Sequence, residues 1–140
     1  MDEAHLLDRE MLEEIRFLLN FRMDSYNPMS LILVGQPELR RILQLQVYEA
    51  IAQRINLRYH LPPMEREEAK GYVAHHLRTA GASSAIFTDD ALDMVYEYAG
   101  GIARKINNLC IACLMAAAAE QKRLIDDRMV KVVIENEFSV

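Results

Sequence analysis

The chain has 140 residues, 51% of them hydrophobic and 26% charged, and its formal net charge is −5. This is the balance of an ordinary globular chain, long enough for one compact domain or two small subdomains. The negative charge argues against a protein coated in nucleic acid, and the longest apolar run, 109–119, is too short to span a bilayer. With an acidic N-terminus and two cysteines, a cytoplasmic location without membrane contact is expected.

The first quarter of the chain predicts a helix, a turn and a strand. Apolar residues recur every three or four positions over 6–23, which predicts a helix with one buried stripe. That stripe is Leu7, Met11, Ile15, Leu18 and Leu19. Residues 24–28 predict a turn, because Pro28 cannot continue a helix. Residues 29–34 are nearly all apolar, which predicts a strand buried on both faces.

Gly35 and Gln36 then lead through Pro37 into two short predicted helices, about 37–44 and 46–55. Residues 56–61 alternate apolar and polar side chains, which predicts a half-exposed strand at a sheet edge. Pro62 and Pro63 follow this strand and mark a subdomain boundary.

The remainder reads as helix only. The patterns and stop signals predict helices over 65–80, 88–99, 102–121 and 126–137. The predicted fold is therefore an α/β remnant with two strands over 1–62, followed by an all-α subdomain over 64–140, predominantly helical as a whole.

Asp2 and Glu3 form an adjacent carboxylate pair close to the N-terminus. In a nucleotide-hydrolysing site, one such carboxylate holds the water shell of Mg²⁺ and its neighbour polarises the attacking water. The alternative is a simple helix start, where acidic residues act as caps and as partners of the helix dipole. The pair alone does not decide between the two.

Three further polar residues follow in a suggestive order. Gln36 comes directly after the apolar strand and has a donor and an acceptor with which to orient water, although it also suits a plain turn. Arg54 ends a helix, where a cation could serve a neighbouring subunit or simply favour the helix C-terminus. Arg104 and Lys105 stand in the first turn of a helix, the wrong end for cations, which indicates either a phosphate partner or solvated side chains.

Taken together, these stretches resemble AAA+ ATPases of the ExeA, or general secretion pathway A, type, with relatives among transposition helper ATPases. The stretches that carry the resemblance are DEAH at 2–5, LILVGQPELR at 31–40, AQRI at 52–55, YHLPP at 59–63 and GIARKIN at 101–107. The resemblance covers essentially the whole chain.

The resemblance implies a role for each of these residues. Asp2 and Glu3 match the Walker B pair, with Asp2 meeting Mg²⁺ through water. Gln36 matches sensor 1, Arg54 matches the arginine finger with Arg58 as a weaker candidate, and Arg104 matches sensor 2. The helical subdomain over 64–140 matches the AAA+ lid.

One departure limits the function expected of this chain. The phosphate-binding Walker A motif of the family, GxxxxGK followed by Ser or Thr, does not occur in the sequence. The chain therefore resembles the C-terminal part of an ATPase module that binds ATP and Mg²⁺ when intact, and it is expected to bind neither alone. The strands at 29–34 and 56–61 would lack their family neighbours, so we expect them to pair with each other or between chains.

Two kinds of function remain open. The first is part of an ATPase that self-associates and works with a secretion assembly factor or, alternatively, with a transposase and DNA. The second is a helical interaction module without catalysis. Cys110 and Cys113 are expected to be buried structural thiols, since their setting is apolar and mid-helical. The spacing of His60, His75 and His76 predicts no metal site.

Overall fold

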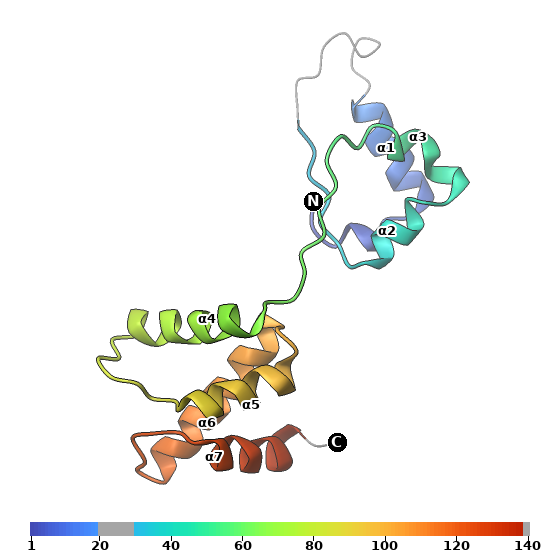
Figure 1. The fold of residues 1–140 in the computed structure, drawn as a ribbon. Helices are drawn as coiled ribbons and strands as arrows, with labels where there is room; N and C mark the ends of the chain where they lie inside the picture. Colours follow the sequence, from blue (N-terminus) through green and yellow to red (C-terminus); the bar gives the residue numbers. More distant parts are fainter. Residues whose placement is uncertain (20–29, 139–140) are drawn as a thin grey trace. The chain divides into compact units, whose positions relative to one another are not determined.

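The computed structural model describes residues 1–19 and 30–138, and its contacts divide the chain into two compact units, Met1–His60 and Leu61–Val140. Figure 1 shows that helices dominate the described residues of each unit, which confirms the predominantly helical character. The predicted two-stranded sheet is not formed in these residues. The predicted turn at 24–28 lies outside them. No helix in the described ranges is long and apolar enough to cross a membrane.

The first unit contains short helices. They are the 3₁₀ turn Ala4–Leu6, α1 (Arg9–Leu19), α2 (Glu38–Ile42), the 3₁₀ turn Gln46–Tyr48 and α3 (Glu49–Ala52). The helix predicted from residue 6 is interrupted, because Leu7 is extended and the Asp8 Oδ1 accepts a 2.8 Å hydrogen bond from the Met11 amide. This break shifts the helical phase. Leu12 is therefore fully buried and Met11 is 50% exposed, so the predicted stripe was right at Ile15 and wrong at Met11.

Residues 30–34 are extended and are held on one edge by the N-terminus, as Figure 1 shows. The Met1 amino group donates to the Ile32 carbonyl (2.8 Å), and the Val34 amide donates to the Met1 carbonyl (2.9 Å). These two bonds follow the pattern of a parallel ladder. Of the two pairings expected for this segment, the one with residues 56–61 is wrong, since no hydrogen bond joins these two segments within the described ranges. Pairing between chains stays a prediction.

The prediction that 29–34 would be buried on both faces was also wrong for residues 30–34. Leu31 and Leu33 pack against the core of Leu12, Ile15 and Ile51. The side chains between and after them are exposed, Ile32 by 72% and Val34 by 51%. In the part that the structure describes, this segment has one covered face because only one layer of helices packs on it.

Residues 56–61 do not form the predicted edge strand. Leu57, Tyr59 and Leu61 are each more than 80% exposed. The alternation of side chains was recognised correctly, but no neighbouring strand in the described residues supplies the hydrogen bonds that would make a sheet.

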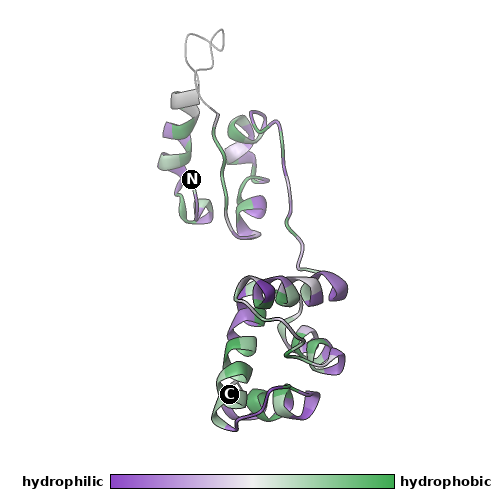
Figure 2. Cartoon of the chain, turned by 90° about the vertical axis from the view of Figure 1, so that its left-hand side faces the viewer, coloured by the Kyte–Doolittle hydropathy of each residue, from purple (hydrophilic) through white to green (hydrophobic). Residues whose placement is uncertain are grey.

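In its described residues, 61–138, the second unit contains four α-helices joined by loops. They are α4 (Arg66–Thr79), α5 (Asp89–Ala99), α6 (Ala103–Ala119) and α7 (Asp127–Val133), which continues into a π-helical turn, Ile134–Phe138. Each predicted helix is confirmed to within a few residues at either end. Figure 2 shows hydrophobic and hydrophilic residues on each of these helices, as expected where one face packs inward.

Side-chain caps define where α4, α5 and α7 begin. The Thr88 hydroxyl accepts a hydrogen bond from the Ala91 amide (3.2 Å), and the Asp126 carboxylate accepts one from the Met129 amide (2.9 Å). In α4 the Glu68 carboxylate reaches back to the Glu65 amide at 2.9 Å and completes a capping box. Such caps satisfy amides that have no partner within the helix.

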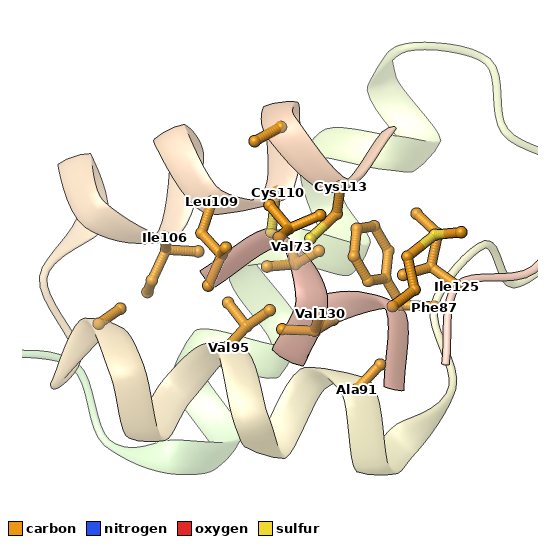
Figure 3. Packing of buried hydrophobic residues seen from close by; sticks show 14 of the residues in the cluster. Val73, Phe87, Ala91, Val95, Ile106, Leu109, Cys110, Cys113, Ile125 and Val130 are labelled. Carbon is orange, nitrogen blue, oxygen red and sulfur yellow. The ribbon is translucent and has the colours of Figure 1, made fainter. Parts of the chain in front are cut away.

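The core of the second unit is a single apolar cluster to which all four helices contribute (Figure 3). Val73 of α4, Val95 of α5, Leu109 of α6 and Val130 of α7 lie within it. The two cysteines of α6 are buried and are not joined in a disulfide, which confirms the prediction of buried structural thiols. Burial, aided by its neighbouring thiol, raises the pKa of Cys110 to about 12.

Charged side chains join α4 to α5 on the outside of this core. Asp93 accepts from Arg66 Nη1 at 2.8 Å and lies 2.9 Å from Lys70 Nζ. The hydrogen bond from Lys70, followed by that from Arg66, lowers the pKa of the Asp93 carboxyl. The network therefore stabilises the ionised carboxylate in the folded unit.

Candidate functional site

The acidic pair lies in a strained turn beside the 30–34 segment. Glu3 has φ 55° and ψ 30°, a left-handed conformation that is uncommon for a residue with a side chain and costs about 1–3 kcal/mol. The Asp2 Oδ1 accepts a 2.8 Å hydrogen bond from the Glu3 amide, and the Ala4 amide donates to the Val34 carbonyl at 2.8 Å. The pair is therefore held in a defined turn beside the 30–34 segment.

His5 connects the acidic turn to the residue after the extended segment. Its Nδ1 accepts a 3.3 Å hydrogen bond from the Gln36 amide, and its Nε2 lies 3.4 Å from Glu3 Oε2. The His5 side chain is only 11% exposed, whereas that of Glu3 is 63% exposed. The imidazole thus stands between a carboxylate open to solvent and the backbone of Gln36.

Gly35 leaves the space that His5 occupies. A methyl group at this position would lie 3.1 Å from the backbone nitrogen of His5, 3.3 Å from His5 Nδ1 and 3.2 Å from Leu39 Cδ2. Such distances are tighter than ordinary contacts, so a larger residue would require small shifts of His5 or Leu39. The Gly-Gln turn and the His5 ring therefore fit each other.

The two candidate arginines of the first unit stand at the end of α3. Arg58 Nη2 donates to the Ala52 carbonyl at 2.7 Å and caps the last turn of that helix. The Arg54 amide donates to the Ile51 carbonyl at 3.0 Å, and its side chain is half-buried. The guanidinium of Arg58 is therefore engaged in a structural hydrogen bond within its own unit.

Arg104 lies in the second unit, in the first turn of α6, and is exposed. The turn before it is tied to the start of the unit, because the Met64 amide donates to the Gly101 carbonyl at 3.0 Å. Within the described ranges, no group of three or more acidic, histidine or cysteine side chains is arranged to hold a metal ion.

The structure thus brings three of the five predicted site residues together: Asp2, Glu3 and the backbone of Gln36. Arg54 belongs to the same unit but stands on another helix, and Arg104 belongs to the second unit. His5 belongs to the acidic motif at 2–5, and no role was predicted for it from the sequence. Its position two residues after Glu3, opposite a glycine, was the available signal.

Comparison with known proteins finds similarity in the part of the chain that contains the acidic turn and Gln36. A family model described as an AAA domain matches residues 1–43, which include Asp2, Glu3 and Gln36. The chain is 40% identical over 119 residues to General secretion pathway protein A from Aeromonas hydrophila, a match that covers 85% of this chain. The chain spans 22% of the length of that relative.

Proposed function

We propose that the chain is part of an AAA+ ATPase of the general secretion pathway A type and that it supplies the carboxylate pair and sensor segment of an ATP-hydrolysing site. The observation that carries this proposal is the linked arrangement of Asp2, Glu3, His5 and Gln36 within the stretch that matches the AAA domain. The strained backbone of Glu3 supports it, because such conformations concentrate at functional sites.

The donor chemistry of the pair suits the metal that accompanies ATP. Mg²⁺ is bound in proteins through one or two carboxylates together with water molecules and substrate phosphates. Asp2 is exposed and presents one such carboxylate. Bound Mg·ATP would bring the phosphoryl group and the charge neutralisation that its transfer requires. The phosphate-binding contacts would come from a Walker A loop, which these 140 residues do not contain.

The residues of this chain would then divide the work. Glu3, exposed and directed by its left-handed backbone, would polarise the attacking water, and Gln36 would help to orient it. Arg54 would act on the site of a neighbouring subunit as a cation that offsets developing charge, and Arg104 would contact a phosphate from the lid. Self-association of subunits is therefore part of the proposal.

The biological setting of the proposal is assembly of a secretion complex. The name of the Aeromonas relative favours this setting over transposition. The partner would be a secretion assembly factor, and the ATPase would work on the cytoplasmic side.

Two measurements test the proposal. Calorimetric titration of the 140-residue chain with Mg·ATP should show no binding tighter than millimolar, and tighter binding would contradict the division of the site. A chimera in which this chain replaces the matched stretch of the Aeromonas relative should hydrolyse ATP at a rate close to that of the unaltered relative. Hydrolysis by the relative but not by a folded chimera would refute the assigned role.

A further inference from the structure

The geometry points to His5 as a positioning residue that couples the Glu3 carboxylate to the sensor segment at Gln36. The catalytic consequence of this inference rests on the proposed function. The contacts of His5 do not depend on that function. His5 is not among the site residues predicted from the sequence.

The hydrogen bonds define the state of the imidazole. The Gln36 amide is a donor, so His5 Nδ1 must be the unprotonated nitrogen that accepts at 3.3 Å. In the neutral ring the proton is then on Nε2, the nitrogen that lies 3.4 Å from Glu3 Oε2. One side chain therefore presents an acceptor to the sensor backbone and a donor to the catalytic carboxylate.

The surroundings favour a fixed ring over a mobile one. The side chain is 11% exposed, Ala4 beside it is 1% exposed, and a Cβ atom at position 35 would lie within 3.3 Å of His5. A buried polar ring with both nitrogens facing partners holds those partners in register. Movement at Gln36 would therefore be transmitted to Glu3 through a rigid imidazole, and not through the longer path along the backbone.

Substitutions can separate the two halves of this link. In His5→Asn the Oδ1 stands close to the position of Nδ1 and keeps the acceptor for Gln36. In His5→Gln the Nε2 keeps a donor toward Glu3. His5→Ala removes both. His60→Ala is the matched control, since His60 is an exposed histidine of the same unit with no interaction in the described structure.

The test is nuclear magnetic resonance of the 140-residue chain, with readouts that do not require ATP hydrolysis. Long-range ¹H–¹⁵N spectra should show His5 with its proton on Nε2. The Gln36 amide should exchange with solvent about fivefold faster in His5→Ala and His5→Gln, the loss expected for one hydrogen bond, and should stay unchanged in His5→Asn and His60→Ala. The Glu3 carboxyl signal should shift in His5→Ala and His5→Asn and not in His5→Gln.

Other outcomes overturn the inference. A proton on Nδ1, or equal effects of Asn, Gln and Ala at position 5, would show that His5 fills space without linking the two residues. The catalytic consequence is tested in the chimera, where His5→Ala should lower kcat without raising KM and should cause no further loss in a Glu3→Gln background. An equal loss in both backgrounds would refute coupling through Glu3. If Glu3→Gln has no effect, the proposed function fails, while the spectroscopic result stands.

Discussion

Replacement of Gly101 by alanine should destabilise the second unit, because this glycine is both left-handed and in close contact with backbone. Its φ is 74°, a conformation that costs a residue with a Cβ atom about 1–2 kcal/mol. The added methyl would overlap the Met64 carbonyl oxygen and lie 2.9 Å from the Met64 nitrogen. Relief of this overlap must move Met64 and break its 3.0 Å hydrogen bond to Gly101, worth about 1 kcal/mol.

The sum is a loss of about 2–3 kcal/mol, reduced by about 0.4–1 kcal/mol because alanine also restricts the unfolded chain. Two other glycines provide matched controls, since a Cβ at either meets no atom within 4 Å. Gly100→Ala, at φ 59°, should cost only the conformational term of about 1 kcal/mol. Gly71→Ala, inside α4, should stabilise the unit by about 0.5–1 kcal/mol.

The assay is urea unfolding followed through amide signals of the second unit, such as that of Leu109, which report on this unit alone. The expected order of stability is Gly71→Ala, wild type, Gly100→Ala and Gly101→Ala. If the free energies of unfolding of Gly101→Ala and Gly100→Ala differ by less than about 0.5 kcal/mol, the contact with Met64 does not destabilise the unit as argued.

Three further predictions concern stability and reactivity. With its pKa raised to about 12, Cys110 should stay a thiol at pH 8 and react with thiol reagents only as fast as the unit unfolds, whereas in urea both Cys110 and Cys113 should react at once. The pKa of the Asp93 carboxyl is lowered from its ordinary 3.8, so its contribution to stability is present above pH 3.8 and is lost as the pH falls through the lower pKa of the folded state. Asp93→Asn should remove this part of the acid transition, as measured by urea titrations at a series of pH values. Leu12→Ala should destabilise the first unit by about 2–5 kcal/mol in the same titrations, since Leu12 is fully buried, and a smaller loss would show that the core is not centred on α1.

The helices of the second unit were predictable because their signals are local. Thr88 and Asp126 cap the helices that begin at these positions in the sequence pattern, and Met129, Val130 and Val133 form the buried stripe of α7. A cap and a helical stripe depend on neighbours three or four residues away. The sequence therefore contains everything needed to place them.

The first unit was harder because its pattern depends on distant partners. Residues 29–34 have the composition of a strand covered on both faces, yet Ile32 is exposed, since burial depends on which elements pack there. Met11 was placed in the core stripe because the break at Leu7 and Asp8, which shifts the helical phase, has no strong signature. The candidate site was also only partly predictable, because its geometry depends on residues distant in the sequence. Asp2, Glu3 and Gln36 were identified from type and order, but the link through His5 depends on a contact across 31 positions of sequence.

The measurement that tests the central claim most directly separates ATP binding from ATP hydrolysis at Glu3. In the chimera, the Glu3→Gln variant should bind Mg·ATP with unchanged affinity. It should hydrolyse ATP at least about 100-fold more slowly, the loss expected for a residue that acts on the attacking water. Glu14→Gln, an exposed acid of α1, is the control and should do both at the reference rate. Equal turnover by the two variants would contradict the assignment of Glu3 as the catalytic carboxylate.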